Sequence, residues 1–545
     1  MEPLLETAKR NAAKHPKPVD QLFMYGTAGF RCRADLLDST LFRMGLLAVL
    51  RSKATKGTIG VMITASHNPE QDNGVKLTEP MGEMLVPEWE AYATSLANAR
   101  DEDVKEVLRE IITGDGIDMD VTANVFLAKD TRPSSYTLSQ SLQDGIQTLH
   151  GQYTNFGLLT TPQLHYMVRC HNTKGLYGQP TEQGYYTKLS RAYLKLRQLV
   201  SASGDRGYSP VIIVDGANGV GALKIQQLLS FLKGTLDISV CNDGTTGKLN
   251  EKCGADFVKL LQKCPNGVEA VADVKCVSFD GDADRIVYFY VDKEKKFYLL
   301  DGDKLATLFA GYIQNLLTLS GLTLNVGLVQ TAYANGSSTQ YAVQEIKVPV
   351  ACVKTGVKHL HHKAAEFDIG VYFEANGHGT VLYSKRAEEA ISSASQNNSL
   401  SESQRHAAEC LQCLVNLTNQ TVGDALADML LVEAILYAKG WNVQQWNSSY
   451  TDLPNRQLKV KVKDRTVIRT TDAERQVTAP EGLQDAINKT VSNYRQARSF
   501  VRPSGTEDIV RVYAEAETQA SADELAKQIA LQVFQLAGGI GDPPN

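Results

Sequence analysis

Short apolar runs alternate with segments of helical periodicity over most of the 545-residue chain. The runs 125–128, 211–214 and 325–329 are each followed by a turn of small and polar residues and then by a helical segment. Apolar runs of this length, bounded by turn residues, are typical of buried strands. The repeated order of strand, turn and helix therefore predicts three similar α/β units.

The last part of the chain has a different pattern. Residues 458–463 alternate with period two and predict a strand with one lysine-bearing face, which we interpret as solvated. Residues 521–524 read Ser-Ala-Asp-Glu and predict the capping box of a helix that ends at Gly538. This combination predicts a smaller α+β domain.

Two segments before it have contrasting patterns. Residues 424–439 have apolar side chains on almost every face of a helix, and Gly440 follows as a stop signal. This pattern predicts a buried helix. Residues 385–406 are polar and rich in Ser and Asn, so we predict a flexible excursion there.

Composition narrows the class of protein. Hydrophobic residues make up 43% of the chain and charged residues 21%, as in soluble globular proteins, and the length requires several domains. The net charge of −5 disfavours a broad nucleic-acid surface. No apolar run is long enough to span a bilayer. Nine cysteines without paired metal spacing, and no recognisable leader, favour a reducing, cytoplasmic location. We expect neither a nucleic-acid partner nor a membrane partner.

A first candidate for chemistry is the segment 64–69, Thr-Ala-Ser-His-Asn-Pro. It follows the apolar run 59–63 and precedes turn dipeptides, which would place Ser66 at the rim of a sheet. A serine presented in this way can act as a nucleophile or carry a phosphoryl group. Taken alone, the segment is more typical of a serine that only caps a turn.

A second candidate is the acidic turn that contains Asp280, Asp282 and Asp284, between two apolar strand patterns. Carboxylates without Cys or His favour magnesium or calcium. An EF-hand is excluded because Arg285 and Val291 stand where its loop needs Gly and Glu. The alternatives are a solvated acidic turn or a Mg²⁺ site, for which a phosphate on Ser66 would supply a further ligand.

A third candidate is a loop suited to a phosphate dianion. It consists of Arg502, Pro503, Ser504, Gly505 and Thr506, and it offers a guanidinium, two hydroxyls and exposed backbone N–H groups. The strand that follows carries Arg511 on the face opposite its valines, within reach of the same anion. A turn with an incidental arginine remains the alternative.

The order and spacing of these three motifs resemble those of the α-D-phosphohexomutases. Residues 25–31, Tyr-Gly-Thr-Ala-Gly-Phe-Arg, are similar to the amino-terminal active-site loop of that family. Residues 374–379, Glu-Ala-Asn-Gly-His-Gly, are similar to its sugar-selecting loop. Asn376 stands where many glucose and mannose mutases have Ser, and this form resembles the members that act on N-acetylglucosamine phosphates. The resemblance covers nearly the whole chain.

The resemblance implies a fold and an activity. The expected fold is α/β, with three related α/β domains and a smaller C-terminal α+β domain around a central active-site cleft. We expect the domain boundaries to give residues 1–185, 186–298, 299–448 and 449–545. The expected activity is interconversion of N-acetylglucosamine 6-phosphate and 1-phosphate through a phosphoserine and a 1,6-bisphosphate, on the route to UDP-N-acetylglucosamine.

The resemblance also assigns roles to residues, and a monomer is expected. Ser66 would carry the phosphoryl group and, with Asp280, Asp282 and Asp284, bind Mg²⁺. Arg31 and Lys76 match positive residues of the first-domain site, and Lys76 and His378 are both candidates for acid/base work. The residues expected to bind the substrate are Glu374, Ala375, Asn376, Arg502, Pro503, Ser504, Gly505, Thr506 and Arg511.

Three other readings stay open at this level. The chain is a mutase for glucose or mannose phosphates, a phosphatase that sends the phosphoryl group from Ser66 to water, or a non-catalytic sugar-phosphate sensor. Intact carrier, metal and phosphate motifs count against the sensor.

Overall fold

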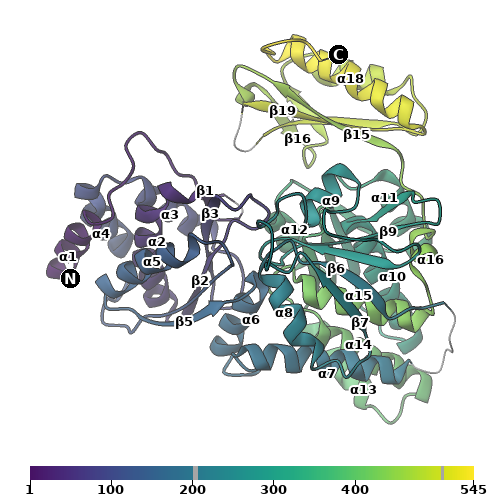
Figure 1. Cartoon of the computed structure of the whole chain (residues 1–545), viewed down its shortest axis with the longest axis horizontal. Coiled ribbons are helices and arrows are strands. Elements are labelled where there is room, and N and C mark those ends of the chain that lie inside the picture. Colours follow the sequence, from purple (N-terminus) through teal and green to yellow (C-terminus); the bar gives the residue numbers. More distant parts are fainter. Residues whose placement is uncertain (27, 201–206, 505–507, 545) are drawn as a thin grey trace. The chain divides into compact units, whose positions relative to one another are not determined.

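The computed structural model describes residues 1–26, 28–200, 207–504 and 508–544 (Figure 1). The chain forms two compact units. The first consists of residues 1–301, 376–380 and 412–443, and the second of residues 302–375, 381–411 and 444–545. The first contains two five-stranded sheets, and most strands of the remaining sheets belong to the second.

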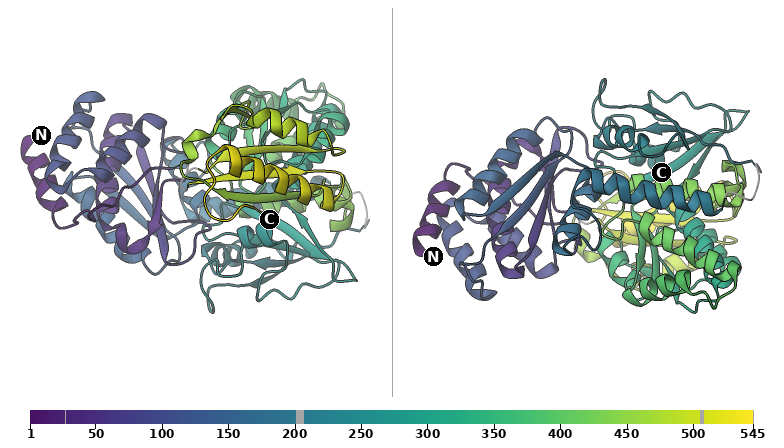
Figure 2. Two further views of the ribbon diagram at one scale, coloured as in Figure 1. Left: turned by 90° about the horizontal axis from the view of Figure 1, so that it is seen from above. Right: turned by 90° about the horizontal axis from the view of Figure 1, so that it is seen from below.

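The first sheet has the strand order β1-β3-β2-β4-β5. Strands β2, β4 and β5 are parallel, and β3 and β1 extend the sheet in antiparallel fashion. Helices α2 and α5 pack on one face of the sheet and α6 on the other (Figure 2). The strands are β1 Phe30–Arg33, β2 Thr58–Ile63, β3 Asp72–Thr78, β4 Asn124–Lys129 and β5 Gln152–Leu158. The helices are α1 Glu2–Ala12, α2 Asp38–Thr55, α3 Pro87–Asn98, α4 Val104–Gly114, α5 Ser135–Thr148, α6 Thr161–Asn172 and α7 Glu182–Leu199.

The second sheet repeats this plan with the order β10-β9-β8-β6-β7. Strands β7, β6 and β8 are parallel, and β9 and β10 are the antiparallel extension. Its elements are β6 Val211–Asp215, α8 Val220–Leu229, β7 Asp237–Cys241, α9 Ala255–Leu261, β8 Lys275–Phe279, β9 Ile286–Val291 and β10 Phe297–Leu300.

Helix α15 (Ala425–Lys439) is the buried helix predicted from its apolar sequence, and it packs on α7, α8 and β9. The Asp424 side chain caps its first turn, and Gly440 ends it in the left-handed conformation.

The third sheet has the order β12-β11-β13-β14. Strands β12 and β13 both run parallel to β11. Its elements are α10 Gly302–Ser320, β11 Val326–Thr331, α11 Gly336–Tyr341, β12 Val350–Val353, α12 Val357–Ala364, β13 Ile369–Phe373 and β14 Gly379–Tyr383. The predicted excursion at 385–406 was wrong, because it is mostly helix: α13 Lys385–Gln396 and the start of α14 Glu402–Leu417. The apolar side chains of Ala387, Ile391 and Ala394 form one buried stripe that holds α13 in place.

The C-terminal part is a three-stranded sheet, β15-β19-β18, with two helices on its valine-bearing face. Its elements follow α16 Val443–Asn447 and are β15 Asn455–Lys461, β16 Arg469–Thr471, β17 Gln476–Ala479, α17 Leu483–Val491, β18 Arg498–Pro503, β19 Ile509–Glu515 and α18 Gln519–Leu536. The predicted capping box at 521–524 was wrong. Helix α18 begins earlier, because the Thr518 hydroxyl accepts the Ser521 N–H.

The observed architecture confirms the predicted fold class of α/β domains with a smaller α+β domain. Among the described residues, no helix combines the length and apolar character needed to cross a membrane.

Candidate active site

Three of the sequence motifs occupy the same position in three sheets. Each lies in the loop that leaves a parallel strand for its neighbour: β2 to β3, β8 to β9, and β13 to β14. Ser66, Asp280 and Glu374 therefore all follow the carboxyl ends of equivalent strands. Ligands of α/β proteins bind at this edge of the sheet.

Ser66 has a strained backbone and a well-held hydroxyl. Its φ of 51° lies in the left-handed region, which costs free energy for a residue other than glycine. Its carbonyl oxygen accepts hydrogen bonds from Arg132 Nη2 at 3.1 Å and Asn250 Nδ2 at 2.8 Å. Its N–H donates to Thr64 Oγ1, 2.9 Å away. These contacts hold the loop so that Ser66 Oγ donates to Asp280 Oδ2 at 2.6 Å.

Asp280, Asp282 and Asp284 form a compact cluster in the first unit. One ligand oxygen from each lies within 4.8 Å of the others, and all three residues are buried. Burial and the negative charges of its two neighbours raise the pKa of Asp280 well above its usual range. Mutual repulsion of this kind is relieved by a cation.

Lys76 supplies part of the missing positive charge. Its Nζ lies 3.0 Å from Asp282 Oδ2 and 3.1 Å from Asp284 Oδ2. Burial acts to lower the pKa of Lys76, but the two carboxylates outweigh it and the pKa is raised. Burial likewise acts to raise the pKa of Asp284, yet Lys76 and His378 hold it well below the usual range. Lys76 is therefore an ammonium ion that bridges two carboxylates.

The cluster fits a Mg²⁺ ion. The donor set consists of oxygen atoms alone, which Mg²⁺ prefers. Asp282 Oδ1 is buried and has no hydrogen-bond partner among the described residues. The other oxygen of this carboxylate is fixed by Thr161, whose Oγ1 donates to Asp282 Oδ2 at 2.5 Å. Thr161 thus orients a carboxylate whose second oxygen is available to a metal.

Arg31 lies close to His67, which follows Ser66 in the serine loop. Arg31 Nη1 is 3.5 Å from His67 Nδ1. The charge of Arg285, burial, and the charge of Arg31 lower the pKa of His67 well below 6.5. His67 is therefore neutral and suited to ordering the loop.

His378 is brought to the carboxylates by a glycine. Gly377 has φ of 87°, and a Cβ there would lie 1.9 Å from the carbonyl oxygen of Ile286. This close approach places His378 Nδ1 at 3.3 Å from Asp284 Oδ1. The His378 N–H also donates to Asn376 Oδ1 at 3.0 Å.

The second unit carries the predicted phosphate-binding residues. Arg502 on β18 and Arg511 on β19 are direct cross-strand partners, and Lys459 on β15 is the partner of Arg511 on its other side. Cross-strand partners point to the same face, so three cations form a row. Like charges side by side favour a bound anion. Gly505 and Thr506 lie outside the described residues, whereas Pro503 ends β18 and Ser504 follows it.

Glu474 is the counter-ion of this row. Its Oε1 lies 3.2 Å from Arg502 Nε. Its Oε2 accepts hydrogen bonds from the Thr355 N–H at 2.9 Å and the Thr355 hydroxyl at 2.6 Å. One carboxylate therefore joins the arginine row to the loop before α12.

Glu374 and Ala375 follow β13 in the second unit. The Glu374 carbonyl packs against Gly302 at the start of α10, where a Cβ would come within 1.9 Å of it. The loop that begins at Glu374 is thereby fixed at its base.

Sequence reasoning missed five residues that the structure connects to these sites: Arg132, Asn250, Thr161, Glu474 and Lys459. Arg132 follows an apolar run in a polar turn, which is a usable signal. Lys459 is exposed, which agrees with the predicted solvated face, but the alternation did not show the neighbouring strand that aligns it with Arg511. The other three have no local signal, since their partners lie far away in the sequence.

Comparison with known proteins gives consistent matches along the chain. Residues 301–441 match the family model for domain III of phosphoacetylglucosamine mutase, and residues 178–287 match domain II. Residues 46–103 match domain I of phosphoglucomutase/phosphomannomutase, and residues 458–532 match its C-terminal domain.

Full-length relatives agree with these matches. The chain is 58% identical to phosphoacetylglucosamine mutase of Homo sapiens, over 98% of both chains. A solved Aspergillus fumigatus N-acetylphosphoglucosamine mutase in complex with GlcNAc-6P and magnesium is 48% identical, with a TM-score of 0.92 over 98% of this chain and 99% of that one. A serine-to-alanine variant of that mutase in complex with glucose 1,6-bisphosphate is 47% identical, with the same TM-score and coverage. The chain belongs to the phosphoacetylglucosamine mutase family of α-D-phosphohexomutases.

Proposed function

We propose that the chain interconverts N-acetylglucosamine 6-phosphate and N-acetylglucosamine 1-phosphate by phosphoryl transfer to and from Ser66. The observation that carries this proposal is the 2.6 Å hydrogen bond from Ser66 Oγ to Asp280 Oδ2, which sets the carrier hydroxyl against the carboxylate cluster. A phosphate on that oxygen would stand beside the groups able to hold a metal. The reaction passes through a 1,6-bisphosphate and serves the route to UDP-N-acetylglucosamine.

Asp280, Asp282 and Asp284, together with the phosphate of Ser66, would hold Mg²⁺. When bound, it offsets negative charge on the phosphoryl group and makes phosphorus more electrophilic. The complex of the A. fumigatus relative with GlcNAc-6P and magnesium supports both the metal and the sugar.

The remaining first-unit residues act on the reacting groups. Arg31 steadies the transferring phosphoryl group with its guanidinium. Lys76 balances the charge of two carboxylates through its paired contacts and is one candidate to move the sugar hydroxyl proton. His378, 3.3 Å from Asp284, is the other candidate.

The second unit binds the part of the substrate that does not react. Arg502 and Arg511, adjacent across β18 and β19, grip the existing phosphate together with Pro503, Ser504, Gly505 and Thr506. Glu374 and Ala375 select the sugar, as does Asn376, which belongs to the first unit. Asn376 both donates and accepts hydrogen bonds, which suits an N-acetyl group.

We also propose domain boundaries that give residues 1–185, 186–298, 299–448 and 449–545, a cytoplasmic location and a monomer without a nucleic-acid partner. The net charge of −5 supports the last point.

The test is a coupled assay with N-acetylglucosamine 6-phosphate, with and without magnesium, on protein whose Ser66 phosphorylation is checked by intact mass. We expect magnesium-dependent formation of the 1-phosphate. Ser66→Ala should lower the rate at least about a thousandfold without lowering the melting temperature. A Ser66→Ala variant that keeps most of the rate would refute the phosphoserine scheme. Glucose and mannose phosphates assayed in parallel test the sugar assignment.

A further inference from the structure

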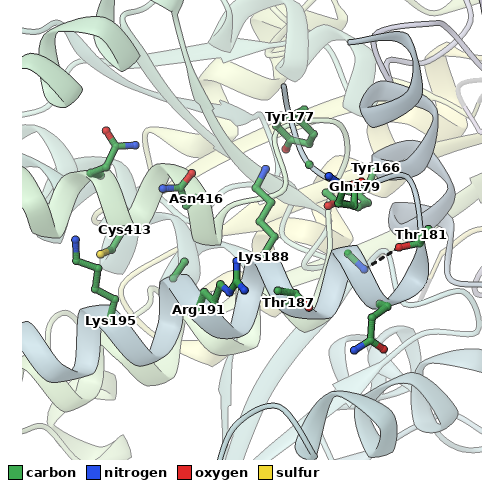
Figure 3. Close-up of a pocket in the computed structure, with 15 residues that line it drawn as sticks. Tyr166, Tyr177, Gln179, Thr181, Thr187, Lys188, Arg191, Lys195, Cys413 and Asn416 are labelled. Carbon is green, nitrogen blue, oxygen red and sulfur yellow. Dashed lines mark hydrogen bonds between the residues drawn. The ribbon is translucent and has the colours of Figure 1, made fainter. Parts of the chain in front are cut away.

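A pocket of about 660 Å³ lies in the first unit, against α7, the segment before it, the middle of α6 and the end of α14 (Figure 3). Its lining includes Tyr166 on α6 and Cys413 and Asn416 on α14. The lining contains none of the residues assigned to phosphoryl transfer, metal binding or substrate binding. The volume is within the range of small-molecule sites.

Positive charge lines one wall of the pocket. Lys188, Arg191 and Lys195 stand on successive turns of α7, and Figure 3 shows their side chains along the pocket side of this helix. No Asp or Glu lines the pocket among the described residues. Arg191 and Lys195 form no ion pair with any described residue. Such a concentration of positive charge attracts an anion.

One of these cations is held in place by an aromatic ring. Lys188 Nζ lies 3.3 Å from the ring centroid of Tyr177, and Arg169 Cζ lies 4.0 Å from the same centroid. The Tyr177 hydroxyl is itself fixed, because it accepts the N–H of Gln420 at 3.0 Å. The ammonium group is therefore positioned before any ligand arrives, which lowers the entropy lost on binding.

Most of the rest of the lining is neutral and polar. Gln179, Thr187, Gln412 and Asn416 supply amides and a hydroxyl. Gln412 Oε1 is buried and has no hydrogen-bond partner among the described residues. A buried acceptor of this kind is satisfied by a hydroxyl or N–H donor on a ligand. The pocket thus combines a cationic wall with groups that bind an uncharged polar body.

We propose that this pocket binds a phosphorylated metabolite with at least two negative charges on a hydroxyl-bearing body. Nucleoside diphosphates and sugar bisphosphates share this chemistry. Phosphate oxygens would contact Lys188, Arg191 and Lys195, and the hydroxyl-bearing body would contact Gln179, Gln412 or Asn416.

Isothermal titration calorimetry tests the proposal, with uridine diphosphate and fructose 1,6-bisphosphate as separate probes. The pocket variant is Arg191→Glu/Lys195→Glu. The matched control is Lys14→Glu/Lys233→Glu, which makes the same change of charge at exposed lysines outside the pocket. A third variant, Arg511→Ala, reports whether a probe binds at the row of cations Arg502, Arg511 and Lys459 in the second unit.

We expect at least one probe to bind the wild type, the matched control and Arg511→Ala with similar affinity. The pocket variant should bind it at least about tenfold more weakly and keep the wild-type mutase rate. The probe that binds identifies the nucleotide or the sugar class. If the melting temperature of the pocket variant is lower than that of the wild type, the variant Arg191→Gln/Lys195→Gln is used in its place.

Three outcomes would overturn the proposal. The first is that neither probe binds at millimolar concentration. The second is that the pocket variant binds a probe as tightly as the matched control does, and the third is that Arg511→Ala alone abolishes binding. The last would place the probe at the substrate phosphate row.

Discussion

Replacing Thr161 tests whether the orientation of one carboxylate controls the metal. Thr161 Oγ1 donates to Asp282 Oδ2 at 2.5 Å, while its N–H donates to the carbonyl oxygen of Asp282 at 3.1 Å. Thr161→Val keeps the shape of the side chain and the backbone contact. It removes only the hydroxyl that fixes the carboxylate.

The magnitude follows from the charge of the acceptor. A hydrogen bond to a charged group contributes about 1.5–3 kcal/mol, which corresponds to roughly a 10- to 100-fold change in metal affinity. The effect should lie toward the lower end, because Lys76 Nζ still contacts the same oxygen at 3.0 Å. Catalysis at saturating magnesium should change much less.

The assay is the mutase rate as a function of magnesium concentration. We expect the half-saturating magnesium concentration to rise about tenfold or more in Thr161→Val. Thr161→Ser, which keeps the hydroxyl, should stay close to the wild type. A folded Thr161→Val protein with the wild-type magnesium dependence would refute the idea that this hydroxyl positions a metal ligand.

Further predictions concern the cationic row of Arg502, Arg511 and Lys459 and the stability of the first unit. Arg511→Ala should raise KM for the sugar phosphate strongly with little change in Tm. Lys459→Ala should raise KM less, because Lys459 is exposed at the end of the row. An unchanged KM in Arg511→Ala would show that Arg511 does not bind the substrate phosphate. Glu474→Gln should lower KM by up to about fivefold, because the carboxylate competes with substrate for Arg502; a raised KM contradicts this competition. The hydrogen bond with Asp38 raises the pKa of His15 above 6.5. The stabilisation of the fold by the His15–Asp38 pair is therefore complete below pH 6.5 and is lost as pH rises through the higher folded-state pKa of His15. His15→Gln should lower Tm in mildly acidic but not in alkaline solution. An equal loss of Tm at both pH values would contradict this pH dependence.

Local patterns were enough for the elements that are buried on all sides. The helix at 424–439 was predicted almost to the residue, because its apolar surface and Gly440 are both local signals. The helix at 385–396 was missed, because only Ala387, Ile391 and Ala394 are buried in a polar sequence. A narrow apolar stripe does not stand out against polar neighbours.

The sequence also determined which residue types take part in the chemistry. A loop serine, alternating aspartates and an arginine-bearing loop each have a short-range pattern that indicates a phosphoryl carrier, a hard-cation site or a phosphate nest. The sequence alone could not establish which of these residues lie in contact in the folded protein. Ser66 and Asp280 are separated by 214 positions, and only the pairing of β2 with β3 and of β8 with β9 fixes the loops that carry them.

Tertiary structure alone decided the supporting contacts. Asn250 reaches the Ser66 carbonyl across 184 positions, and Thr161 reaches Asp282 across 121. The cationic row of Arg502, Arg511 and Lys459 depends on strand register, which aligns residues from three separate strands. The physical reason is that periodicity along a chain records which face of an element is buried, whereas hydrogen bonds and ion pairs depend on distances that exist only after the strands have paired.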